Sequence, residues 1–297
     1  MSTGDRARQH AAGWLFAGPA LALITVFFAV PALMAFVLSF TDFDIYSIGD
    51  PASTRFVGLD NYRALFAHPL FWTALKNTLY YVAVGGPLSV AMSLAAAVLL
   101  HSKLTRWKPF FRGAFFAPWV TTLVAVALVW RYLYHPQYGP VNAMLGWFGL
   151  PPVDWLGSPR WAMPAIILVS VWKNFGYNML VFLAGLQAIP AELYEAAELD
   201  GASAWHRFRH VTLPLLGPTF VFVGVVTMIA AFQIFSEPYV MTQGGPLKST
   251  LTLVLFMYEQ GFRWWRLGFA AAVAVVLFLL TLIGTLLQFS LRRSTDG

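Results

Sequence analysis

Six long apolar stretches constrain what this chain can fold into. They cover about residues 14–40, 75–100, 110–134, 161–187, 214–241 and 267–291. A hydrocarbon layer of about 30 Å needs roughly 20 helical residues to cross it, and each stretch is long enough. Only 11% of the 297 residues are charged, whereas about a quarter are charged in a typical soluble domain. The sequence therefore predicts an all-α integral membrane protein with six transmembrane helices.

The spacing of these stretches also predicts the domain organisation. No hydrophilic block of domain size lies between them, so we expect one transmembrane domain over residues 14–291. Residues 1–13 and 292–297 are predicted to be short tails. The first stretch is too long for the core of a signal peptide, and we expect it to be retained as the first span.

The distribution of lysine and arginine predicts which side each loop faces. An even number of spans places both termini on one side, and the side richer in basic residues near the span ends is normally cytoplasmic. One set of termini and loops carries ten such residues, and the opposite set carries eight. The ten are Arg6, Arg8, Lys103, Arg106, Lys108, Arg112, Arg207, Arg209, Arg292 and Arg293. We expect both termini and the 188–213 loop in the cytoplasm, and we attribute the net charge of +6 to topology and not to nucleic-acid binding.

The sequence lacks a convincing catalytic or metal site. The segment GGPLKST at residues 244–250 has Leu247 where a nucleotide P-loop needs a glycine before its lysine, so we expect a turn there. His206 and His210 are four residues apart, but a solvated basic helix face explains them better than a metal does. The chain has no cysteine, which excludes thiolate metal sites. We expect this chain to bind no cofactor or metal and not to be an enzyme.

One dense polar segment, residues 188–213, separates the fourth and fifth stretches. Three glutamates recur at every third residue from Glu192 to Glu198 among leucines and alanines, which predicts a short helix with an acidic edge. Asp200 and Gly201 suit the turn that ends such a helix. A second short helix should follow, so the segment forms a helix-turn-helix bracket. Its small alanines favour docking of another protein over a membrane-surface loop that has no partner.

This bracket resembles a known motif. The sequence EAAELDGASAWHRFRHVTLPLLGP at residues 195–218 resembles the EAA signature of the permease subunits of binding-protein-dependent ABC importers. FVGLDNYRALF, VWKNFGYNMLVFLAGLQAIP and MTQGGPLKSTLTLVLFMYEQGF look like the carbohydrate-uptake branch, which contains the maltose- and glycerol-phosphate-type permeases. The residues that this resemblance assigns to ATPase coupling are Glu195, Ala196, Ala197, Asp200, Gly201, Ala202, Leu213 and Pro214.

The resemblance implies that solute delivery, passage through the membrane and ATP hydrolysis are performed by different subunits. It implies the type I, maltose-transporter-like permease fold, with a cytoplasmic coupling helix that begins around Glu195. An extracytoplasmic solute-binding protein would deliver the solute, and a second, similar permease would pair with this chain. Two ATPase subunits would hold ATP and Mg²⁺ and drive alternating access as a rigid-body switch. The assembly would lie in the cytoplasmic membrane of a bacterium or archaeon.

Candidate solute contacts lie on the fourth and fifth spans, by their position in the family pattern. Sugars are bound by planar hydrogen-bonding groups and by aromatic faces. The candidates are Ser170, Trp172, Lys173, Asn174, Tyr177, Gln233 and Glu237. For each of them, a bridge between helices or a contact with the partner permease is an alternative role.

Several functions remain open at this stage. The leading hypothesis is a permease subunit of an ATP-driven importer of a mono- or oligosaccharide or a related polyol phosphate. An importer of glycerol-3-phosphate or its diesters would have the same architecture, and Lys173 does not decide between them. A membrane-embedded enzyme acting on lipid-linked sugars would need positioned acids or a metal near an interface. An ion-coupled transporter is disfavoured because few charges lie inside the spans, and an exporter is disfavoured because the EAA pattern belongs to importers.

Overall fold

The computed structural model describes residues 3–102 and 105–293, and these residues are almost entirely helical. Lys103 of the predicted cytoplasmic set lies outside them, as do the ends of both predicted tails. The chain divides into two compact units. The first comprises Met1–His68 and Met257–Val276, and the second comprises Pro69–Phe256 and Leu277–Gly297.

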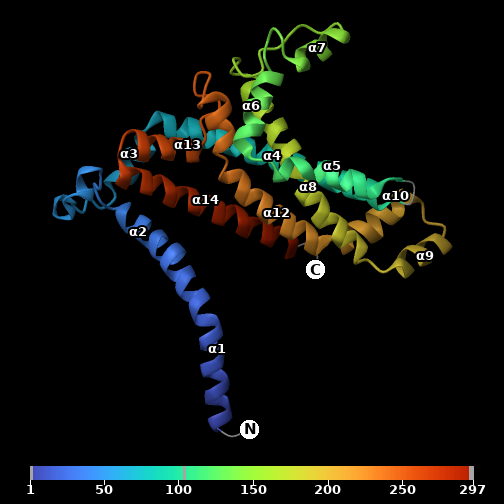
Figure 1. Ribbon diagram of the computed structural model, residues 1–297, viewed down its shortest axis with the longest axis horizontal. Helices are drawn as coiled ribbons and strands as arrows, with labels where there is room; N and C mark the ends of the chain where they lie inside the picture. The colour runs from blue at the N-terminus through green and yellow to red at the C-terminus, as the bar shows by residue number, and fades with distance from the viewer. Residues whose placement is uncertain (1–2, 103–104, 294–297) are drawn as a thin grey trace. The chain divides into compact units, whose positions relative to one another are not determined.

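The first unit contains one long apolar span and a compact polar connection. The span is built from α1 (Thr3–Ile24), the π-helical turn η1 (Thr25–Ala29) and α2 (Val30–Leu38) (Figure 1). None of the residues Trp14–Leu38 is buried, so within this unit the apolar surface of the span is uncovered. The connection contains η2 (Tyr46–Ile48), η3 (Pro51–Ser53) and α3 (Asp60–Ala67), and η6 (Glu259–Arg263) also belongs to this unit.

Polar side chains close the end of this span. The amide of Asn61 donates to the carbonyl oxygens of Ser39 at 2.9 Å and Thr41 at 2.8 Å. These carbonyls follow the last turn of α2, where helical partners run out. Asp42 accepts hydrogen bonds from the backbone and the guanidinium of Arg55, which together lower the pKa of its carboxyl group. The chain therefore leaves the span through a defined turn.

The second unit contains most of the other helices. They are α4 (Pro69–His101), α5 (Lys108–Val120), α6 (Leu123–Leu133), α7 (Pro140–Trp147), α8 (Ala162–Gln187), α9 (Ala191–Leu199), α10 (Ala204–Arg207), η4 (Phe208–Thr212), α11 (Leu213–Leu215), α12 (Gly217–Phe232) and η5 (Pro238–Thr242). Two further helices, α13 (Leu253–Tyr258) and α14 (Leu267–Arg293), each contribute residues to both units.

Helix α8 is the centre of the second unit. It packs against α4, α5 and α12 (Figure 1). One apolar cluster surrounds Ile166 toward the start of α8, and a second surrounds Met179 and Phe182 toward its end. Ser93 of α4 donates to the carbonyl oxygen of Phe175 at 3.0 Å between the two clusters. Because α8 is covered on most sides, its polar residues must find partners within the protein.

The structure agrees with the predicted number of spans and changes the form of two. Four helical segments are long and apolar enough to cross a membrane, and two bent helix pairs bring the number to six if each pair is one span. The predicted span 110–134 is divided between α5 and α6, which meet at 99°. The predicted span 214–241 bends by 67° before Gly217, and its helix ends at Phe232. Pro118 lies near the first bend, and Pro218 lies just after the second. Neither residue has the backbone N–H that would continue the helical hydrogen bonds.

Helices α5 and α8 approach closely at Gly176. A β-carbon added to Gly176 would overlap the carbonyl oxygen of Phe115. The absence of a side chain therefore permits this crossing, and the neighbouring rings of Phe115 and Phe175 pack with their centroids 5.5 Å apart.

We expect Gly176→Ala to lower the thermal stability of the purified protein. A methyl group at this crossing would force the two backbones apart, at a cost of roughly 1–3 kcal/mol. The matched control is Gly113→Ala on α5, where an added β-carbon meets nothing within 4 Å and alanine favours the helix. Equal melting temperatures for both variants would show that the crossing is not close-packed.

Candidate functional site

The bracket begins with α9 and ends that helix with a Schellman motif. The backbone N–H of Ala202 donates to the carbonyl of Ala197 at 2.9 Å, and the N–H of Gly201 donates to the carbonyl of Glu198 at 3.1 Å. Gly201 has a φ of +76°, a left-handed conformation in which glycine carries no β-carbon penalty. The chain then reverses, and the Ser203 hydroxyl caps α10 by accepting from the N–H of His206 at 3.2 Å.

Two side-chain contacts tie the halves of the bracket together. The hydroxyl of Tyr194 on α9 lies 3.0 Å from that of Thr212, which is buried in η4. Arg207 of α10 pairs with the carboxylate of Glu198 at 2.9 Å. Glu198 is largely exposed in this ion pair, and such pairs contribute little stability, so we assign the main tether to the part-buried hydroxyl pair. The bracket is therefore a shaped element and not a slack linker.

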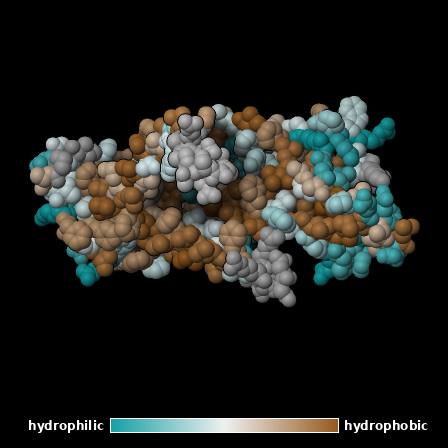
Figure 2. Space-filling view, turned by 90° about the horizontal axis from the view of Figure 1, so that it is seen from below, coloured by the Kyte–Doolittle hydropathy of each residue, from teal (hydrophilic) through white to brown (hydrophobic). Residues whose placement is uncertain are grey.

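The bracket exposes two large apolar side chains beside its charged residues. Leu199 is 90% exposed at the end of α9, and Trp205 is 67% exposed at the start of α10. Figure 2 shows hydrophilic residues gathered at the end of the second unit where α9 and α10 lie. Both apolar side chains are therefore available for contact with another protein.

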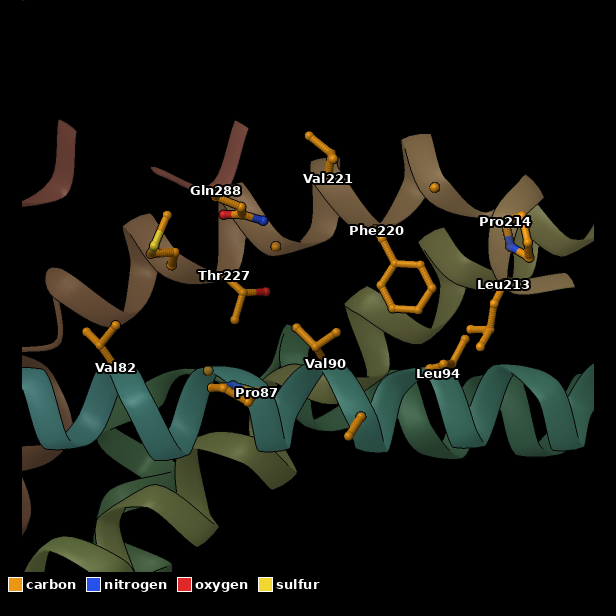
Figure 3. Close-up of a pocket in the computed structure, with 15 residues that line it drawn as sticks. Val82, Pro87, Val90, Leu94, Leu213, Pro214, Phe220, Val221, Thr227 and Gln288 are labelled. Carbon is orange, nitrogen blue, oxygen red and sulfur yellow. The ribbon is translucent and has the colours of Figure 1, made fainter. Parts of the chain in front are cut away.

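The structure divides the predicted coupling residues into two places. Six of them, from Glu195 to Ala202, lie on α9 and its terminal turn, where Glu195, Ala196, Asp200 and Gly201 are exposed. Leu213 and Pro214 lie in α11 and line an apolar groove, together with residues of α4 and α12 (Figure 3). The groove has a volume of about 960 Å³.

A second, more polar cavity of about 440 Å³ lies among α4, α8, α12 and the segment after α12. Five predicted solute contacts line it, namely Ser170, Asn174, Tyr177, Gln233 and Glu237. Trp172 and Lys173 are not among its lining residues. Gly86 and Thr227 line both this cavity and the apolar groove, so the two spaces are neighbours.

Two aromatic rings form a flat wall of the polar cavity. Trp119 of α5 and Tyr177 of α8 stack with centroids 5.0 Å apart and ring planes 18° apart. Asn174 lies one turn before Tyr177 and donates to the carbonyl of Ser170 at 2.8 Å. Its amide oxygen remains a possible acceptor for a hydroxyl group. A planar aromatic surface beside amide and hydroxyl groups suits a polyhydroxylated solute.

Buried polar pairs connect α8 to the segments around the cavity. The Ser170 hydroxyl donates to Glu237 Oε1 at 3.0 Å, and the amide of Asn178 donates to the hydroxyl of Thr227 at 3.0 Å. Glu237 is only 7% exposed. It directly precedes Pro238, the first residue of η5, so the position of its carboxylate is fixed from both its own backbone and α8.

Lys173 lies beside the cavity and hydrogen-bonds to the end of α5. Its ammonium group donates to the carbonyl oxygens of Pro118 at 3.3 Å, Trp119 at 3.2 Å and Thr121 at 3.1 Å. These carbonyls lie at the end of α5, where the helix breaks and its last carbonyls lose their helical partners. A lysine has three N–H donors, and all three are used here. The positive charge also suits the negative end of the α5 dipole.

Sequence reasoning missed several residues that line the cavity. They are mainly Trp119, Tyr81, Ser89, Asn178, Thr227 and Ser236. Trp119 could have been found by its position next to Pro118, but its contact with Tyr177 depends on the packing of α5 against α8. Asn178 follows Asn174 by four residues and extends the same polar face of α8.

The segment at residues 244–250 forms a turn, as expected. The N–H of Gly245 donates to the carbonyl of Thr242 at 3.0 Å, and that of Ser249 donates to Pro246 at 2.9 Å. Asn77 of α4 donates to the carbonyls of Lys248 at 2.9 Å and Leu251 at 3.0 Å. These bonds anchor the turn to α4.

Comparisons with known proteins agree with this architecture. The family described as "Binding-protein-dependent transport system inner membrane component" matches residues 11–297. The lactose transport system permease of Rhizobium radiobacter is 38% identical over 286 residues, which cover 95% of this chain and 94% of that protein. The arabinooligosaccharide transport system permease of Bacillus subtilis is 36% identical over 291 residues, covering 97% and 91%.

A solved structure has the same fold. It is a chain of a bacterial ABC transporter that imports the acidic polysaccharide alginate, with a TM-score of 0.79 and 23% identity. The match covers 99% of this chain and 100% of that one.

Removing the ammonium group of Lys173 should destabilise the protein. We expect Lys173→Met to cost roughly 1–3 kcal/mol, because the part-buried carbonyl oxygens of Trp119 and Thr121 at the end of α5 lose the ammonium group as their donor. Lys76→Met, at an exposed position of α4, is the control and should change stability by less than about 0.5 kcal/mol. Thermal melting of the purified transporter measures both. A Lys173 variant as stable as the control would mean that the lysine does not cap the break.

Proposed function

This chain belongs to the family of inner membrane components of binding-protein-dependent transport systems, and we propose that it carries a sugar through the cavity beside α8. It is a multi-pass membrane protein and the permease subunit of an ABC importer. The solute we propose is a mono- or oligosaccharide. Relatives whose names specify lactose and arabinooligosaccharides support this choice.

The polar cavity is the observation that carries the proposal. Its stacked rings of Trp119 and Tyr177 offer an apolar face, and Asn174 and Gln233 add amide groups at its wall. Sugars combine apolar ring faces with a rim of hydroxyl groups, so such a wall binds them without a formal charge. With a volume of about 440 Å³, the cavity falls in the usual range for small-molecule sites.

We propose that the bracket couples ATP hydrolysis in the partner subunit to transport by this chain. In our proposal α9 docks into an ATPase subunit through its exposed Glu195, Ala196 and Leu199. The ATPase closes on ATP and Mg²⁺, and the permease responds by switching between inward- and outward-facing states. We infer that ATP hydrolysis is performed by the partner subunits and not by this chain.

The remaining partners follow from the same proposal. A second, similar permease pairs with this chain, and an extracytoplasmic solute-binding protein delivers the sugar. Both termini and the bracket face the cytoplasm, and the assembly lies in the cytoplasmic membrane of a bacterium or archaeon. The excess of basic residues at this set of span ends supports that orientation.

The coupling role predicts the effect of a bulky acid at Gly201. An added β-carbon there meets nothing within 4 Å, so Gly201→Glu does not clash inside this chain. We expect it to leave membrane insertion intact, to reduce co-purification of the ATPase at least tenfold, and to abolish uptake.

Gly149 provides a matched control for this experiment. Its φ is +71°, and an added β-carbon there also meets nothing within 4 Å, so Gly149→Glu introduces the same strain and charge away from the bracket. This variant should retain the ATPase. If Gly201→Glu retained both the ATPase and uptake, the bracket would not be the coupling element.

The cavity role predicts a change in apparent affinity when its aromatic wall is removed. We expect Tyr177→Leu to raise the KM for uptake about two- to tenfold, which corresponds to about 0.4–1.4 kcal/mol, because the variant lacks the aromatic ring that lines the cavity. The ATPase should stay bound. The labelled solute in this assay is the sugar that co-purifies with the binding protein.

Trp172→Leu is the control because Trp172 lies on the same helix but outside the cavity lining and packs on Trp130. Its KM should equal that of the unaltered protein. An unchanged KM in Tyr177→Leu would place the solute elsewhere.

A further inference from the structure

The loop between α4 and α5 concentrates positive charge at the ends of two apolar helices. Arg106, Lys108 and Arg112 lie within seven residues of one another, and no aspartate or glutamate occurs between Asp60 and Asp154. Helix α4 is long and apolar enough to span a membrane, and α5 belongs to a bent pair that passes the same test. The residues that join them therefore lie at a face of the bilayer, where lipid headgroups are found.

This loop contains a hollow that is separate from both the solute cavity and the bracket. It has a volume of about 640 Å³ and is lined by Thr105, Arg106, Trp107, Phe110 and Phe111. Trp107 is 76% exposed and Phe110 is 64% exposed. Tryptophan is enriched at the membrane interface, and phenyl rings suit the adjacent hydrocarbon. The hollow therefore combines a cation with rings that match the edge of a bilayer.

Two hydrogen bonds hold this loop against the last turns of α4. The Thr105 hydroxyl donates to the carbonyl oxygen of Leu99, and the ammonium group of Lys108 donates to that of His101 at 3.2 Å. Lys108 is also the first residue of α5, so the positive end of that helix dipole lies beside the hollow. The hollow is therefore held by the chain itself and has a positive potential.

The arginine side chains of this loop have donors without acceptors among the described residues. Arg106 is exposed and forms no ion pair with another described residue. The Nε atom of Arg112 is buried and has no hydrogen-bond partner in the part of the chain that the structure describes. A guanidinium group presents a planar set of donors that matches the oxygens of a phosphate group. A ligand that carries a phosphate would supply the missing acceptors.

We propose that this hollow binds an anionic phospholipid of the surrounding bilayer, with the headgroup phosphate at Arg106 and the acyl chains along Phe110 and Phe111. A lipid fits both features of the hollow, because its phosphate balances the positive charge and its chains cover the exposed rings. An acidic soluble partner or free phosphate would satisfy the charge alone. The inference goes beyond the proposed function and does not depend on which solute the protein carries.

Quenching by brominated lipids measures this binding at the site itself. Ala114 is exposed on α5, four residues after Phe110 and three after Phe111, so it lies on the same face of the helix. Because the chain has no cysteine, Ala114→Cys accepts a single small fluorophore. The assembled transporter, with cysteine-free partner subunits, is placed in phosphatidylcholine bilayers that contain equal amounts of either brominated phosphatidylglycerol or brominated phosphatidylcholine.

We expect brominated phosphatidylglycerol to occupy the hollow about tenfold more strongly than brominated phosphatidylcholine. Arg106→Gln should lower this preference about fivefold, which is the usual effect of one basic residue near a membrane surface. Arg106→Lys keeps the charge and should preserve most of the preference. The control is Arg131→Gln, which removes a charge from an exposed position of α6 outside the hollow and should leave the preference unchanged.

Three results would overturn the inference. Equal quenching by the two lipids, or a preference that persists in Arg106→Gln, would show that the hollow does not select an anionic lipid. Displacement of the brominated lipid by inorganic phosphate, beyond the effect of chloride at the same ionic strength, would make the hollow a site for a soluble anion. Loss of the ATPase from Arg106→Gln with the lipid preference intact would assign the basic loop to protein docking.

Discussion

Hydrocarbon cannot hydrogen-bond, so every interruption of a membrane helix must be satisfied by another part of the protein. In this chain α8 supplies these partners. Lys173 caps the end of α5, Ser170 holds Glu237 beside η5, and Asn178 bonds to Thr227 of α12. These side chains lie along one buried helix: Ser170 and Asn178 line the cavity together with their partners Glu237 and Thr227, and Lys173 lies beside it. Structure and proposed transport pathway therefore depend on the same helix.

The apolar pattern of the sequence was sufficient to predict the all-helical membrane fold and six spans, because the length and composition of each stretch are local properties. The bends were not predictable in this way. The stretch 110–134 is mostly apolar, and the partner at its division between α5 and α6 is Lys173, more than fifty residues away along the chain, which donates to the carbonyl of Thr121. The crossing of α5 over α8 places Trp119 against Tyr177, and this contact between distant segments could not be predicted, so half of the aromatic wall was missed. Helical spacing placed Ser170, Asn174 and Tyr177 on one face, but it could not show that Lys173 turns to α5.

The bracket was predicted in more detail because its signals are local. Alanine and glutamate favour the helix, and Gly201 ends it, so residues 191–202 were interpreted correctly as a helix and a turn. The tether between Tyr194 and Thr212 joins residues on either side of that turn and required the structure. It fixes the second half of the bracket against α9, close to α12, which begins five residues after Thr212. Leu213 and Pro214, which are predicted to be coupling residues, lie along that connection.

The central claim is that a partner ATPase acts on the cavity through the bracket, and a reversible crosslink tests it most directly. Leu199 is 90% exposed at the end of α9, and the chain has no cysteine, so Leu199→Cys can be joined to a cysteine on the ATPase by a disulfide. Our account predicts that this crosslink forms in the assembled transporter and stops sugar uptake. Reduction of the disulfide should then restore uptake. A crosslinked transporter that imports sugar at the uncrosslinked rate, or the absence of any crosslink to the ATPase, would contradict it.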